Sequence, residues 1–155
     1  MQRLFLLFAV LVSGVRIEQR AHTPPPAELS ALATRAHLAA PIAAWCHGEF
    51  RGAHTGEYAV AITRPSRGGQ YLLLAPDATA IELAAFTGSA DLSCYSPAEA
   101  RKLNASIQRS ETIHGTLAPR WRTTVVCGFV DDTSAVCWQY SPSDRSFVKV
   151  GEWVT

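Results

Sequence analysis

The stretch that decides the fold is TTVVCGFV-DDTS-AVCWQY, residues 123–140. Two runs rich in β-branched and aromatic residues, 123–130 and 135–140, flank four residues of turn-forming composition. This pattern predicts a β-hairpin. A turn of three residues at 131–133 pairs Val130 with Ser134 and fixes the register of the two strands.

The same register places Cys127 opposite Cys137, where a non-hydrogen-bonded pair brings the two Cβ atoms close enough for a disulfide. Four cysteines allow three pairings, and the sequence alone leaves the choice open. The hairpin favours Cys127–Cys137, which then joins Cys46 to Cys94. A zinc site is the alternative, but neither pair has the two-residue spacing of a zinc knuckle.

More strands are predicted upstream of the hairpin. Alternating or continuous apolar runs cover 58–62, 71–75 and 80–86, and segments rich in Pro and Gly separate them. Short strands joined by short turns form an antiparallel meander. Downstream, residues 147–150 add an edge strand.

Two helices complete the predicted elements. Apolar residues recur at helical spacing from Leu29 to Ala40, and Pro41 ends the run. Ser96-Pro97-Ala98-Glu99 has the pattern of a capping box with proline at the first helical position. This second helix is expected to run to about Gln108 and to bury Ala98, Leu103 and Ile107 or near neighbours.

The predicted fold class is therefore α+β. One antiparallel sheet of about five or six strands carries two short helices, and disulfides link the chain. Residues 27–155 form a single domain of this kind, because the length suits one domain and 48% of the residues are hydrophobic.

The N-terminus indicates export. Arg3 precedes an apolar run from Leu4 to Val12 that ends in Ser13-Gly14, so residues 1–14 are predicted to be a signal peptide. The run is shorter than the ~20 residues that span a bilayer, and no stable membrane insertion is expected. The alternatives are an apolar N-terminal element of a cytosolic protein or a misplaced start codon. Residues 15–26 end in three prolines and are predicted to form a linker.

Charge and cysteine content limit the partners and the compartment. The chain has 14 basic and 13 acidic residues, so removal of Arg3 with the signal leaves 13 of each. A neutral domain has no general attraction for nucleic acid. An even number of cysteines behind a signal peptide predicts a periplasmic or secreted protein with disulfides.

Part of the chain is similar to a known motif. Residues 46–52, CHGEFRG, and 56–62, GEYAVAI, resemble the FG-GAP type of β-hairpin, and Gly69 to Leu74 continue the similarity. In that family the loop often carries several Asp or Asn residues that bind calcium. Here the loop at 51–57 holds a single carboxylate, whereas Ca²⁺ takes about six or more oxygen ligands. The resemblance therefore implies the hairpin and no metal, and the chain has room for only one such unit of a propeller.

A cluster of polar residues lies in the same region. His47, Glu49 and His54 have the side chains of a zinc site with an open position for water, which would suit a metal-assisted hydrolase. Polar side chains beside a glycine-rich turn more commonly face solvent. We therefore predict no metal, no cofactor and no catalytic residues.

The best candidate for ligand binding is Arg120-Trp121-Arg122, where a large aromatic ring stands between two permanent cations. The alternative is a strand with Trp121 turned inward and both arginines outward.

These features predict an exported, non-catalytic binding module for a protein or a cell-envelope glycan. Two other functions stay open: a periplasmic metal-assisted hydrolase that uses His47, Glu49 and His54, and a secreted inhibitor of a hydrolase.

Overall fold

The structure, a computed structural model, describes residues 24–66 and 68–155. Within them the chain forms two helices and nine strands. In chain order these are α1 (Ala27–Arg35), β1 (Ile42–Gly48), β2 (Glu57–Thr63), β3 (Gly69–Leu74), β4 (Ala80–Phe86), β5 (Leu92–Tyr95), α2 (Pro97–Arg109), β6 (His114–Leu117), β7 (Val125–Phe129), β8 (Ser134–Ser141) and β9 (Ser146–Val154).

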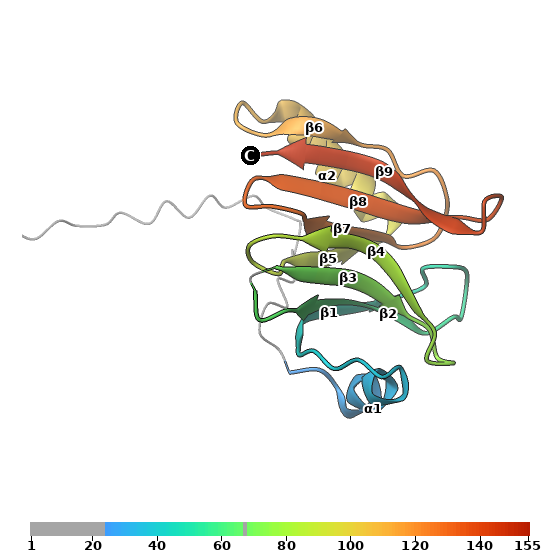
Figure 1. The fold of residues 1–155 in the computed structure, drawn as a ribbon. Coiled ribbons are helices and arrows are strands. Elements are labelled where there is room, and N and C mark those ends of the chain that lie inside the picture. Colours follow the sequence, from blue (N-terminus) through green and yellow to red (C-terminus); the bar gives the residue numbers. More distant parts are fainter. Residues whose placement is uncertain (1–23, 67) are drawn as a thin grey trace, which may run out of the picture.

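The strands form two antiparallel sheets (Figure 1). The first has the order β1-β2-β3-β4, and the second has the order β5-β7-β8-β9-β6. The class is α+β with a large excess of sheet, but the expectation of one sheet with five or six strands is wrong. Two sheets form because both faces of the first sheet carry apolar side chains, so each face needs a covering layer.

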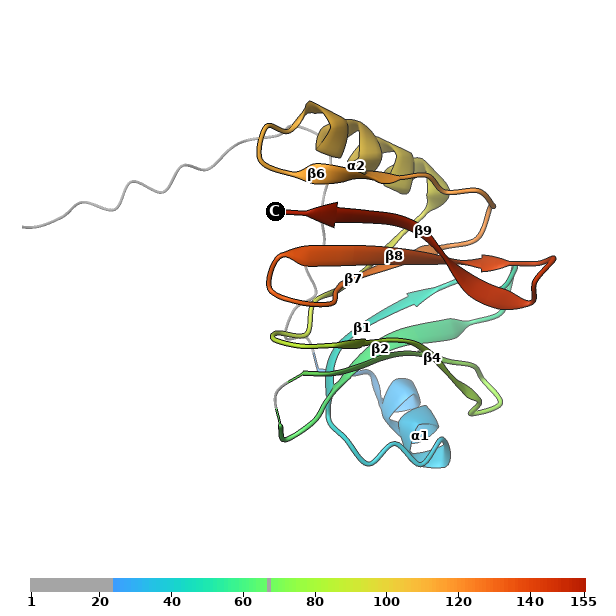
Figure 2. The same ribbon diagram turned by 45° about the horizontal axis from the view of Figure 1, so that its top comes forward.

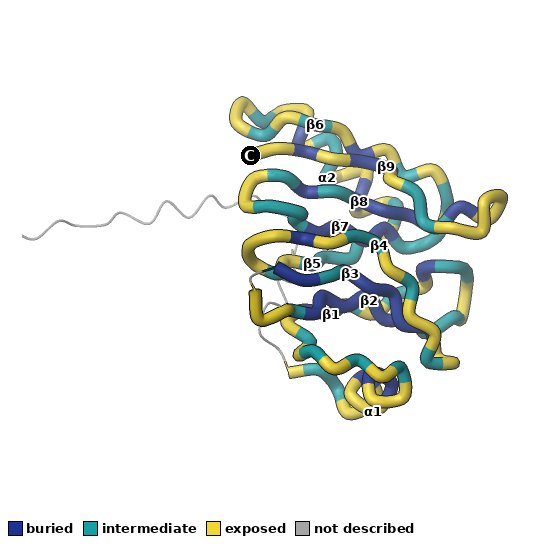
Figure 3. The backbone as a smooth tube through the Cα atoms, viewed as in Figure 1, coloured by how far each residue is buried: buried dark blue, intermediate teal, exposed yellow. Residues whose placement is uncertain are grey.

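Four layers result from this packing. Figure 2 shows α1 and α2 at opposite ends of the molecule, with the two sheets between them. Leu29 and Leu32 of α1 pack on Val60 and Leu72 of the first sheet. The middle of the sandwich is filled by the side chains of both sheets, and the buried stretches in Figure 3 follow the central strands.

The second helix connects the two edges of the five-stranded sheet. All neighbouring strands in this sheet are antiparallel, so β5 and β6 at its two edges run in the same direction. Helix α2 crosses the outer face between them, and the β7-β8-β9 meander fills the space between the edges. Asn104 Oδ1 of the helix accepts a hydrogen bond of 2.8 Å from the Leu117 N–H on β6.

The β7–β8 hairpin has the predicted register. Cys127 lies opposite Cys137, and the Val130 N–H donates a 2.8 Å hydrogen bond to the Ser134 carbonyl. Both disulfides are present, one joining Cys127 to Cys137 and the other joining Cys46 to Cys94. The first lies within the hairpin, whereas the second ties β1 of one sheet to β5 of the other.

The predicted meander of β2, β3 and β4 is confirmed. Three strands, β1, β5 and β6, were not expected from the sequence. Strands β5 and β6 have only four residues each, so their patterns are too short to recognise. Strand β1 has seven residues and begins at Ile42, directly after Pro41. Strand β9 also differs from its prediction, because it has nine residues and lies between β8 and β6 rather than at an edge.

The helix predictions hold with two changes. The Ser96 Oγ accepts from the Glu99 N–H at 3.3 Å, and Glu99 Oε2 accepts from the Ser96 N–H at 2.8 Å, which confirms the capping box. The helix ends at Arg109, but it buries Ala100 and Ile107 while Ala98 is exposed. The first helix already stops at Arg35, and His37 beyond it has a left-handed φ of 54°.

The predicted signal peptide and most of the predicted linker lie outside the described residues. Among the described residues, no helix combines the length and hydropathy needed to cross a bilayer. The residues that resemble an FG-GAP hairpin occupy β1, the following loop, β2 and β3; the resemblance itself stays a hypothesis.

Candidate functional site

Arg120-Trp121-Arg122 lies in the connection from β6 to β7, and not in a strand. Burial nevertheless alternates along it. Both arginines are exposed, while Trp121 is half-buried and packs against the apolar core under α2. Neither guanidinium forms an ion pair with any residue in the described part of the chain.

The backbone of this connection is held by Gln139, a fully buried residue of β8. Its Oε1 accepts hydrogen bonds from the N–H groups of Arg120 at 2.9 Å and Trp121 at 3.2 Å. Its Nε2 donates to the carbonyls of Trp121 at 3.0 Å and Thr123 at 2.8 Å. One amide side chain thus completes four backbone hydrogen bonds in a segment that has no strand partner there. We call residues 120–123 the clamped loop.

The three residues considered for a metal site do not form one. His47 is exposed, and its ring packs on Tyr58 with centroids 4.8 Å apart. Glu49 Oε1 accepts a 3.1 Å hydrogen bond from the backbone N–H of His54. No group of three or more His, Cys, Asp or Glu side chains in residues 24–66 and 68–155 is placed to hold a metal ion.

The second carboxylate of this loop is also used within it. Glu57 is fully buried and forms an ion pair with the Arg51 guanidinium, and its Oε2 accepts from the Arg51 N–H at 3.1 Å. A buried carboxylate needs such partners, because an unpaired one loses its hydration without compensation. The loop at 49–57 therefore uses its two acids to hold its own shape.

Asp131 has a similar local role in the β7–β8 turn. Its Oδ1 accepts from the N–H groups of Thr133 at 2.8 Å and Ser134 at 2.7 Å. These hydrogen bonds hold the pKa of the Asp131 carboxyl below its usual value, and the bond from the Thr133 N–H has the largest effect. The interpretation of Asp131 as a turn-forming residue is confirmed.

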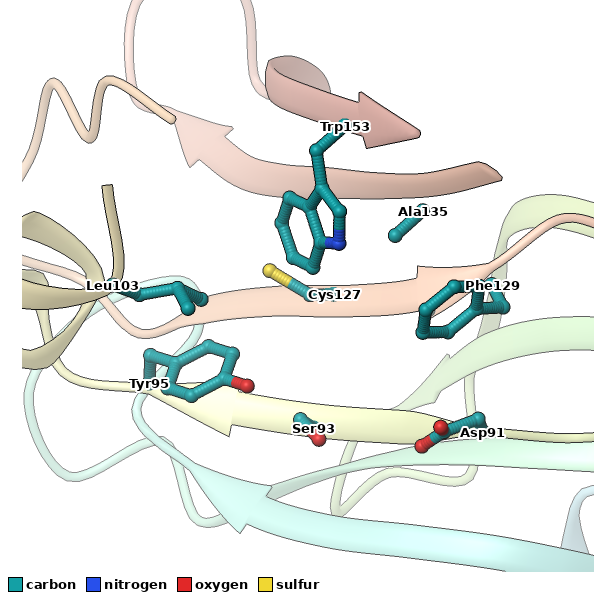
Figure 4. A pocket seen from close by; sticks show the side chains of 9 residues that line it. Asp91, Ser93, Tyr95, Leu103, Cys127, Phe129, Ala135 and Trp153 are labelled. Atoms are coloured by element: carbon teal, nitrogen blue, oxygen red, sulfur yellow. The ribbon is translucent and has the colours of Figure 1, made fainter. Parts of the chain in front are cut away.

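The sequence did not point to a pocket on the outer face of the five-stranded sheet (Figure 4). Its volume is about 190 Å³, and α2, β5, β7, β8 and β9 contribute to its walls. The lining residues are Asp91, Ser93, Tyr95, Leu103, Cys127, Gly128, Phe129, Ala135 and Trp153. A second hollow of about 220 Å³ shares Asp91 and Phe129 and adds Ser89, Asp131 and Asp132.

The polar groups of the pocket follow β5 and the residue before it. Asp91, Ser93 and Tyr95 alternate with Leu92 and Cys94, so all three side chains lie on one face of the strand. Burial raises the pKa of Tyr95 above its ordinary value. A hydrogen bond with Ser93 lowers this pKa, whereas the nearby charges of Asp91 and Glu99 raise it further. The phenol is therefore neutral at physiological pH and can donate or accept a hydrogen bond.

The signal for this site was present as the alternation of residues 91–95. An alternation of five residues is too short to identify a strand, and capping-box residues follow it directly at Ser96. Only the pairing of β5 with β7 places these residues in one pocket with Phe129 and Trp153.

Comparison of the chain with protein-family models, curated proteins and solved structures finds no match.

Proposed function

We propose that this protein is an exported, non-catalytic binding module that recognises a protein or a cell-envelope ligand through the clamped loop. The observation that carries the proposal is the set of four hydrogen bonds from Gln139. They hold the backbone from which the guanidinium groups of Arg120 and Arg122, which have no ion-pair partner among the described residues, extend into solvent.

The energetics favour recognition by this loop. A buried amide is costly unless each of its polar atoms is paired, and here every pairing goes to residues 120–123. A loop that is already ordered loses little conformational entropy when a partner binds. Arginine carries a permanent charge and binds carboxylate or phosphate with two parallel hydrogen bonds. The expected ligand therefore presents acidic groups.

The two disulfides support the proposed compartment. Each disulfide joins two segments that lie next to each other in the fold. Disulfides persist in oxidising surroundings. Together with the predicted signal peptide, they favour the periplasm or the external medium as the place of action.

The test compares two double variants in binding to envelope material of the source organism. Purified protein lacking residues 1–14 is incubated with isolated cell-wall polymer and, separately, with envelope proteins, and the bound fraction is measured. Arg120→Ala/Arg122→Ala should weaken the binding of wild-type protein at least about tenfold. Arg101→Ala/Arg109→Ala, on exposed positions of α2, removes the same charge elsewhere and should bind like wild type. Equal binding by all three proteins, or no binding to either material, overturns the proposal.

A further inference from the structure

We propose that the pocket beside α2 binds a small organic cation. The ligand has a ring-sized apolar body, a protonated amine at one end and a hydrogen-bond acceptor at the other. This site is separate from the clamped loop, because none of residues 120–123 lines the pocket. The two proposals can therefore fail independently.

The size and lining of the pocket suit one ring. An apolar cavity of about 150 Å³ accommodates benzene, and the pocket measures about 190 Å³. Its apolar lining comes from Leu103, Phe129, Ala135 and Trp153, on four different elements. Ligand sites commonly combine such walls with a few convergent polar groups.

Trp153 provides an unused hydrogen-bond donor. Its side chain is only 9% exposed, and in Figure 4 its indole nitrogen faces the open space between Ala135 and Cys127. No residue in the described part of the chain accepts a hydrogen bond from this N–H group. The only buried polar side-chain atom without a partner among the described residues is Thr123 Oγ1, so the indole N–H of Trp153 is open to the pocket and can donate to an acceptor atom on a ligand.

The other end of the pocket is acidic. Asp91 borders both the pocket and the adjacent hollow, where Asp131 and Asp132 add two more carboxylates. No Arg, Lys or His lines either space, and none of the three acids is ion-paired within the described residues. The hydroxyls of Ser93 and Tyr95 add further acceptors along the same edge. A carboxylate set of this kind attracts a cation and disfavours an anion.

Tyr71 holds the acidic end in place. Its hydroxyl lies 2.9 Å from the carbonyl oxygen of Asp91 and 2.7 Å from that of Phe129. The residues that border both spaces are thus anchored through their backbones to the other sheet, which leaves the Asp91 carboxylate free to meet a ligand.

The experiment uses four probes of one shape on the disulfide-bonded protein. Tyramine carries both the amine and a phenolic acceptor. Tyrosol lacks the charge, 2-phenylethylamine lacks the acceptor, and 4-hydroxyphenylacetate has the opposite charge. Binding is followed by the NMR signal of the Trp153 indole N–H, which Trp153→Phe identifies among the four tryptophans. Tyramine should shift this signal saturably with a dissociation constant of about 1 mM or tighter. Tyrosol should bind about tenfold more weakly than tyramine, and 2-phenylethylamine at least about threefold more weakly than tyramine. The anion 4-hydroxyphenylacetate should not bind.

Two substitutions locate the charge recognition. Asp91→Asn keeps the shape of the side chain and should weaken tyramine about tenfold while leaving tyrosol unchanged. Glu82→Gln, an exposed acid on β4, should change neither. Saturable binding of tyramine and tyrosol with equal affinity, or an Asp91→Asn variant that binds tyramine like wild type, overturns the cation site. Absence of any saturable shift overturns the ligand site altogether.

Discussion

The Tyr71 hydroxyl lies 2.7 Å from the carbonyl oxygen of Phe129, although the two residues are 58 positions apart in the chain. Tyr71 belongs to the four-stranded sheet and Phe129 to the five-stranded sheet, so this hydrogen bond crosses the interior of the sandwich. The fully buried ring also packs against Phe86 and Trp138. Gly128 makes room for it, since a Cβ there would lie 2.7 Å from the ring. The contact aligns the two sheets and anchors one end of the pocket.

Tyr71→Phe should therefore lower stability without emptying the core. The ring stays, but the carbonyls of Asp91 and Phe129 lose their shared partner, which costs about 1–3 kcal/mol. Urea unfolding measures the change. Tyr140→Phe is the matched control, because no hydrogen bond of its hydroxyl is present among the described residues, and it should change stability by less than about 0.5 kcal/mol. Equal losses in the two variants would contradict the role of the Tyr71 hydroxyl.

The burial of the Tyr71 phenol should also make the protein sensitive to alkaline pH. Burial raises the pKa of Tyr71 to about 12 from an ordinary value of 10.0. Between these values the unfolded chain has released the phenolic proton and the folded chain still holds it, so stability falls as pH rises. The advantage of wild type over Tyr71→Phe should stay constant up to about pH 10 and shrink towards pH 12. Brief urea titrations of both proteins at each pH test this, and an advantage that grows above pH 10 would disprove it.

Gln139 should control the order of the clamped loop. Gln139→Glu keeps the one acceptor oxygen that serves the Arg120 and Trp121 N–H groups. It cannot donate to the Trp121 and Thr123 carbonyls, and it buries a charge. We expect a loss of about 2–4 kcal/mol at neutral pH and faster hydrogen exchange at the Arg120 and Trp121 amides. Gln70→Leu, on β3, serves as the comparison and should leave both amides as protected as in wild type. If exchange at these amides did not change in Gln139→Glu, the clamp would have no role in ordering the loop.

The two disulfides should contribute unequally. In the loop-entropy estimate, the 48-residue separation of Cys46 and Cys94 gives about 4 kcal/mol, and the 10-residue separation of Cys127 and Cys137 gives about 2.7 kcal/mol. Each value is measured as the difference in unfolding free energy between the oxidised and reduced forms of one sequence. The Cys46–Cys94 disulfide is measured in the variant Cys127→Ala/Cys137→Ala, which lacks the other disulfide. The Cys127–Cys137 disulfide is measured in the variant Cys46→Ala/Cys94→Ala. A larger difference for the short loop would show that chain entropy does not set the order.

The sequence by itself determined the features that depend on residues close together in the chain. The turn at 131–133 sets the register that places Cys127 opposite Cys137. Ser96 and Glu99 form the capping box at the start of α2, as their spacing predicts. The β2-β3-β4 meander followed from apolar runs and the turns between them. Such elements are decided by local geometry and hydrogen bonds, which a short stretch of sequence contains in full.

Only the tertiary structure decided how these elements combine. The division into two sheets, the interior position of β9, and the pairing of β5 with β7 and of β6 with β9 depend on which strands, distant in the chain, lie side by side. The candidate sites have the same origin. Gln139 binds a loop 16 to 19 residues away, and Trp153 and Asp91 line one pocket although β7 and β8 lie between β9 and β5. The energy of these contacts comes from burial shared among segments far apart in the chain, so no single segment carries their pattern.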